Sequence, residues 1–165
     1  MKELCLTVLT ALFCMIISNR VQAQSAQPKL DQIKLMQAMA GTLQHIISKD
    51  SLEISESQQY GNAFVQNVYL VVKGKKSFRY GTVTVYSPKE DKFKSFWFRP
   101  NGTYSTFISS FTAENKWSAN SVQNFNPEKV LGKSEMILET PTNMTAIFYK
   151  PDGTKGGEYK WTKVK

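Results

Sequence analysis

The chain has 165 residues with a formal net charge of +8, and 41% of them are hydrophobic. Its single histidine, His45, excludes multi-histidine metal sites. Both cysteines, Cys5 and Cys14, lie in the N-terminal segment, so the remainder has no disulfide, thiolate nucleophile or cysteine metal site.

The N-terminus has the pattern of a secretory signal peptide. Lys2 precedes an apolar run over 4–17, and Val21-Gln22-Ala23 follows as a cleavage site. The run is 14 residues long, which is short against the about 20 that span a bilayer. We therefore expect cleavage after Ala23 and an exported protein, periplasmic or secreted, with no transmembrane segment left. A retained anchor is the alternative.

Removing residues 1–23 leaves 142 residues, a length typical of one domain. The remaining 19 Lys and Arg and 12 Asp and Glu give a net charge of +7. In an exported protein this charge favours anionic surfaces or acidic ligands over nucleic acid, which we do not expect as a partner. Lysines also occur in nearly every predicted turn, as solubility and protection of strand edges require.

Residues 24–41 are predicted to form a polar leader and one helix. The helix is expected to begin at Pro28, because proline is tolerated in a first turn, and to end at Gly41. Its apolar stripe contains Leu30, Ile33, Met36 and Ala40. Packing against a core is the ordinary role of such a stripe.

From Thr42 onwards the hydrophobic period is two, which predicts one all-β domain over 42–165. The candidate strands are 43–49, 52–59, 63–73, 78–86, 92–98, 103–111, 117–124, 133–140, 144–150 and 157–163. Short connections between them favour an antiparallel up-and-down meander. About ten twisted strands favour closure into a β-barrel, because an open sheet would leave two long edges.

The strand over 63–73 is apolar on both faces, so something is expected to cover its outer face. The N-terminal helix is one candidate for this cover. A partner subunit, and hence a homodimer, is the other.

The central hairpin, 78–100, is rich in aromatic residues, and its polar turn over 87–91 contains Pro88 and Asp91.

Several segments carry a resemblance to a known family: Met39-Ala40-Gly41-Thr42, Tyr80-Gly81-Thr82-Val83-Thr84-Val85-Tyr86, 93–98, Asn101-Gly102 and Glu158-Tyr159-Lys160-Trp161.

Together these segments resemble the exported bacterial lipocalin-like (calycin) domains, most of which have no known function. The resemblance covers nearly the whole chain after residue 23. It implies a calycin-type barrel that can hold a lipophilic ligand, and it supplies no catalytic residues. The chain departs from the lipocalin pattern at Gly41-Thr42-Leu43, where that pattern has Gly-x-Trp.

Few residues suggest catalytic or cofactor chemistry. His45 lies on the first predicted strand, where it is either an axial ligand for haem or a hydrogen-bonded side chain. No pair of carboxylates stands in an apolar setting, so residues such as Glu53, Glu56 and Glu135 are predicted to be solvated surface charges. We therefore expect neither an enzyme nor a bound cofactor or metal.

The aromatic residues provide the one candidate ligand-binding site. Its predicted members lie on successive strands: Tyr69, Tyr80, Trp97, Arg99, Phe107 and Tyr149. Trp161 on the last strand belongs to the same aromatic set. Arg99 follows Trp97 by two residues and therefore shares its face. Apolar walls with one cation suit a fatty acid or similar amphiphile. The alternative is that these rings fill the barrel as its core.

The sequence thus predicts an exported, non-enzymatic binding protein for a small hydrophobic or amphipathic ligand. The alternative is a cell-envelope interaction or structural protein that acts through its basic surface or by self-association. An enzyme that merely shapes a reactive ligand ranks third.

Overall fold

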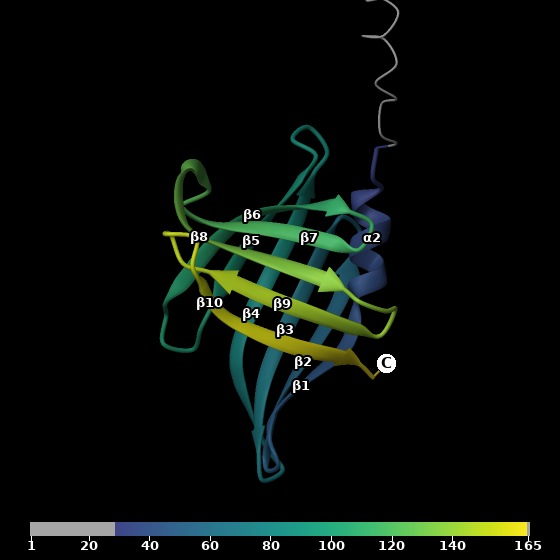
Figure 1. Cartoon of the computed structure of the whole chain (residues 1–165), viewed down its shortest axis with the longest axis vertical. Helices are drawn as coiled ribbons and strands as arrows, with labels where there is room; N and C mark the ends of the chain where they lie inside the picture. Colours follow the sequence, from purple (N-terminus) through teal and green to yellow (C-terminus); the bar gives the residue numbers. More distant parts are fainter. Residues whose placement is uncertain (1–28, 165) are drawn as a thin grey trace, which may run out of the picture.

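A closed antiparallel β-barrel with one short helix forms the described part of the chain, residues 29–164 of a computed structural model. Figure 1 shows the helix lying against one end of the barrel. The predicted signal peptide and residues 24–28 lie outside the described residues. Residues 29–164 contain no helix of the length and hydropathy needed to cross a membrane.

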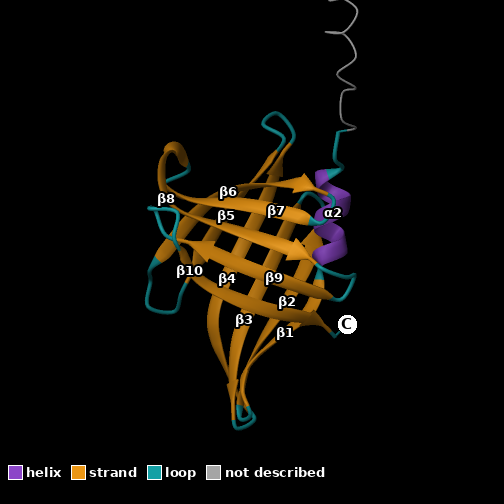
Figure 2. Cartoon of the chain, in the orientation of Figure 1, coloured by secondary structure: helices purple, strands orange, loops and turns teal. Residues whose placement is uncertain are grey.

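Among the described residues the helix, α2, comes first, and ten strands follow it (Figure 2). The elements are α2 (Gln32–Met39), β1 (Gly41–Ser48), β2 (Ser51–Tyr60), β3 (Ala63–Val72), β4 (Lys75–Ser87), β5 (Lys92–Phe98), β6 (Tyr104–Ala113), β7 (Lys116–Gln123), β8 (Asn126–Leu138), β9 (Asn143–Tyr149) and β10 (Lys155–Lys163). Each strand pairs with its neighbours in the chain, and β1 pairs with β10. The predicted ten-strand up-and-down barrel is confirmed.

Strand direction alternates around the barrel, so the connections fall at two ends. The turns after β1, β3, β5, β7 and β9 lie at one end. The turns after β2, β4, β6 and β8 lie at the other, together with α2 (Figure 1). We call the second of these the helix end.

Local sequence explains the tight turns. At Lys73 and Gly74, between β3 and β4, φ is 48° and 78°. Two successive positive φ values match the right-handed twist of a hairpin, and glycine adopts them without a steric penalty.

One strand begins much earlier than predicted. β8 starts at Asn126 instead of residue 133, because the turn falls on Asn124 and Phe125, where φ is 50° and 59°. Register shifts between Ser121 and Gln123 leave Pro127 exposed and outside the regular ladder. Proline is tolerated at such an irregularity because no ladder hydrogen bond needs its missing N–H.

The helix is shorter than predicted, because it begins at Gln32 and not at Pro28. The Asp31 carboxylate accepts a hydrogen bond from the backbone N–H of Lys34 at 3.0 Å, which caps the first turn. Gly41, with φ of 123°, ends the connection and starts β1.

Contrary to one expectation, the helix does not cover the outer face of β3. Met36 and Met39 face the barrel and pack with Phe64, Phe93 and Phe111 in the buried core at the helix end. The helix therefore closes that end of the barrel.

Gln32 fastens the helix to the wall. Its Nε2 donates to the backbone oxygen of Phe111 at 3.1 Å, and its Oε1 accepts from the backbone N–H of Phe111 at 2.8 Å. The residue is 6% exposed. Both hydrogen bonds are thus shielded from water.

We predict that Gln32→Ala lowers the free energy of unfolding by about 2 to 4 kcal/mol, because it leaves the buried backbone N–H and C=O of Phe111 without hydrogen-bond partners. Urea unfolding followed by tryptophan fluorescence measures this. Gln37→Ala on the exposed side of the same helix is the control, with an expected loss under about 0.5 kcal/mol. Equal losses for the two variants would contradict the anchoring role of Gln32.

Candidate ligand-binding cavity

The barrel encloses a cavity of about 530 Å³, so its rings do not fill it as a solid core. Four of the residues that line it are exposed to solvent: Arg79, Phe148, Gly156 and Tyr159. Arg79 and Gly156 lie near the starts of β4 and β10, and Phe148 lies near the end of β9. These positions are at the end opposite α2, so the cavity opens there. We call this the open end.

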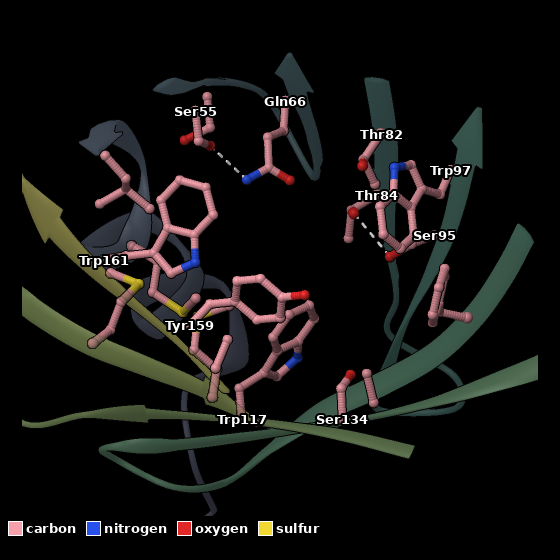
Figure 3. Close-up of a pocket in the computed structure, with 18 of the residues that line it drawn as sticks. Ser55, Gln66, Thr82, Thr84, Ser95, Trp97, Trp117, Ser134, Tyr159 and Trp161 are labelled. Carbon is pink, nitrogen blue, oxygen red and sulfur yellow. Dashed lines mark hydrogen bonds between the residues drawn. The ribbon is translucent and has the colours of Figure 1, made fainter. Parts of the chain in front are cut away.

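The cavity has two unlike walls, which face each other in Figure 3. On β2 to β5 the lining carries Ser55, Gln66, Thr82, Thr84 and Ser95. The opposite wall, on β7 to β10 and α2, carries Trp117, Tyr159, Trp161 and the methionines 36, 39, 136 and 144.

Most polar side chains of the β2–β5 wall are hydrogen-bonded to one another. Gln66 Nε2 donates to Ser55 Oγ at 2.7 Å, and the hydroxyls of Thr84 and Ser95 are hydrogen-bonded at 2.8 Å. These groups therefore need no ligand to be stable.

Four of the six predicted site residues line this cavity, and Trp97 is at their centre. The Arg99 guanidinium carbon lies 4.9 Å from the Trp97 ring centroid. The Tyr80 and Phe107 rings lie 4.4 Å and 5.5 Å from the Trp97 ring. The structure also places Trp161 in the lining.

The other two predicted residues, Tyr69 and Tyr149, lie outside the cavity. Tyr69 follows Val68, whose side chain is fully buried, so alternation turns Tyr69 outward, where it packs against Phe78 at 5.9 Å. The Tyr149 hydroxyl donates to the Glu135 carboxylate at 3.4 Å. The structure therefore separates these two tyrosines from the Trp97 cluster.

Glu53 was predicted to be a solvated surface charge, and this is wrong. Its side chain is 4% exposed and forms an ion pair with Arg79. Alternation along β2 places Glu53, Ser55 and Ser57 on the inner face. The period-two pattern could have revealed this, had the inner face of β2 been known.

Arg79 reaches the cavity because of an irregularity in β4. Val68 pairs with Tyr80 and Tyr69 pairs with Phe78, so Arg79 has no partner on β3. In such a bulge the side chain of the extra residue departs from the regular alternation between the two faces of the sheet. Arg79 and Tyr80 consequently both line the cavity, although they are adjacent in sequence.

Burial controls the protonation of Tyr80. It raises the pKa of the phenol to about 12, although the positive charges of Arg79 and Arg99 act in the opposite direction. The hydroxyl is therefore neutral at physiological pH and can donate a hydrogen bond.

Among the residues that line the cavity, two further donors are buried without a hydrogen-bond partner in the described part of the chain, the indole Nε1 groups of Trp97 and Trp117. An unpaired buried donor is costly, so an acceptor inside the cavity would stabilise both. No ion pair joins Arg99 to a carboxylate within residues 29–164. Arg99, Tyr80 and Trp97 thus form a cluster of donors with an uncompensated positive charge.

His45 stands apart from this cluster and does not line the cavity. Its Nδ1 lies 2.8 Å from the backbone oxygen of Lys160, to which it donates, since a carbonyl can only accept. No group of three potential metal-ligating side chains occurs within the described part of the chain.

No protein-family model matches this chain, and a comparison with curated proteins found no match in sequence. The cavity itself is therefore the feature from which a function can be inferred.

We predict that Tyr80→Phe removes a tyrosinate that forms near pH 12 in the ultraviolet absorbance titration of the folded protein. Because the pKa of Tyr80 is raised above its ordinary value of 10.0, the folded state holds this proton more tightly than the unfolded state. Its contribution to stability is complete below pH about 10 and is lost as the pH rises towards 12. An unchanged titration curve in the variant would contradict the burial of this phenol.

Proposed function

We propose that the chain is an exported, non-enzymatic binding protein that holds a small amphipathic molecule in its barrel. The observation that carries this proposal is the pairing of an apolar cavity wall with the uncompensated donors Arg99, Tyr80 and Trp97. The cavity volume of about 530 Å³ lies within the usual range for small-molecule sites.

The positions of these groups define how the ligand lies. An anionic head group, such as a carboxylate, binds at Arg99 and accepts further hydrogen bonds from Tyr80 and Trp97. The apolar tail extends towards the helix end, where Met36 and Met39 line the cavity. Methionine side chains adapt to tails of different shape.

The electrostatics favour an anion over a neutral head group. Arg79 is paired with Glu53, and Glu135, the other carboxylate of the lining, is paired with Lys116 and Lys133. The positive charge left over in the lining therefore belongs to Arg99. A charge-assisted hydrogen bond in a partly desolvated site contributes about 1.5 to 3 kcal/mol. The Trp97 ring beside the guanidinium holds it in place through a cation–π contact.

Export and the lipocalin-like resemblance belong to the same proposal. They are supported by the signal-peptide pattern of residues 1–23 and by the barrel architecture. A protein of this kind sequesters or presents its ligand outside the cytoplasm.

The test is displacement of a fluorescent fatty-acid probe by dodecanoate and by the uncharged dodecanol. We expect both to displace the probe from the wild-type protein. Arg99→Gln should weaken dodecanoate binding by at least about tenfold and leave dodecanol binding within about threefold.

Lys89→Gln, which removes a positive charge from the exposed β4–β5 turn at the helix end, is the matched control. It should change neither affinity. The proposal fails if no probe is bound and displaced, or if Arg99→Gln and Lys89→Gln affect dodecanoate equally.

A further inference from the structure

We propose that the open end of the barrel is a docking surface for an anionic lipid bilayer. The inference goes beyond the proposed function, because it depends on surface residues at one end of the barrel and not on an occupied cavity.

The charge of the barrel is concentrated at this end. The turns of the open end with their flanking residues, 47–52, 71–76, 97–105, 122–129 and 148–156, contain eight Lys and Arg but only three acidic residues, Asp50, Glu128 and Asp152. The helix end, 29–40, 59–64, 86–93, 112–117, 137–144 and 162–164, contains six Lys and Arg and five Asp and Glu. The formal charge is thus +5 at the open end and +1 at the helix end.

Ion pairs neutralise part of the charge at both ends. Lys29 pairs with Asp91 at the helix end, and Lys76 pairs with Glu56 and Lys155 with Glu158 at the open end. At the open end, Lys49, Lys73 and Lys75 form no ion pair with any residue of 29–164. Their charge is available to an external anion.

Exposed apolar side chains occur at the same end. Within the open-end ranges the large exposed apolar side chains are Ile47, Val72, Phe98, Tyr104 and Phe148, and Ile46 (74% exposed) and Leu131 (57%) lie one and two residues beyond them. Within the helix-end ranges, among the described residues, they are Tyr60 and Val164, and Val85 lies one residue beyond.

This combination distinguishes the kind of partner. A soluble polyanion would be held by the lysines alone and would leave the isoleucines in water. A bilayer binds both sets, because its head groups attract Lys and Arg while its interface accepts apolar side chains. An anionic bilayer is therefore the partner that the open end fits best.

Docking in this way would turn the mouth of the cavity towards the bilayer. Arg79 and Gly156, which are both exposed and line the cavity, lie at the open end. In Figure 1 the tips of the β1–β2 and β3–β4 hairpins are at the bottom, away from α2. An amphiphile could then pass between bilayer and barrel, a step that also requires the proposed function.

The test is sedimentation of the purified protein with vesicles of phosphatidylglycerol and phosphatidylcholine, or of phosphatidylcholine alone. The full coding sequence is expressed for every variant, so any N-terminal segment that remains contributes equally. We expect binding to the anionic vesicles that weakens as salt is added.

Reversing two open-end charges, Lys49→Glu with Lys75→Glu, should weaken binding to anionic vesicles by at least about 30-fold, since each basic residue near such a surface contributes about fivefold. Lys129→Glu with Lys150→Glu is a second open-end pair, in case the first does not fold. The control pair at the helix end, Lys89→Glu with Lys92→Glu, makes the same change in net charge and should have less than about a threefold effect.

A double variant, Ile46→Ser with Leu131→Ser, separates the bilayer from a soluble polyanion. It should weaken vesicle binding and leave binding to heparin unchanged. The inference is overturned if the wild-type protein does not bind anionic vesicles, or if the charge reversals at the two ends weaken vesicle binding equally. It is also overturned if the double variant binds vesicles as the wild type does. A failure of fatty-acid probe binding would leave this result intact and would remove only the proposed function.

Discussion

The pairing of β1 with β10 is the constraint on which the rest of the structure depends, because it converts a row of ten strands into a wall with an inside and an outside. The ladder is short, with Leu43 opposite Lys163 and Gln44 opposite Thr162. Beyond it, the imidazole of His45 donates to the backbone of Lys160 and continues the connection across the seam. The lone histidine therefore helps to close the barrel.

Because the barrel is closed, polar residues on its inner face are shielded from water, which they would not be on an open sheet, and buried charges there need partners. Glu53 is buried and must be paired, and Arg79 supplies the charge from a bulge in β4. Arg99 enters the same space without a carboxylate of its own among the described residues, beside the unpaired indole N–H of Trp97. The helix closes the far end with methionines. Shape and charge thus both favour an amphiphile with its head near the mouth.

Sequence patterns predicted much of this fold, because turn residues and a period of two are local signals. All ten strands were expected, and the bounds of β5 were predicted to the residue. Trp97 and Arg99 were correctly placed on one face because they are two residues apart. Such local reasoning could not place the side chains of Tyr69, Arg79 and Glu53 inside or outside the barrel. The bulge in β4 and the inner face of each strand depend on long-range register. The start of β8 was predicted too late, because the turn before it falls on Asn124 and Phe125, which include neither glycine nor proline.

A crystal structure with a fatty acid that carries bromine at its methyl end would test ligand binding in the barrel most directly. We predict carboxylate density at Arg99 and Tyr80, with an anomalous bromine peak near Met36 and Met39 at the helix end of the cavity. A cavity filled by repacked side chains, or a bromine peak found only on the outer wall, would contradict it.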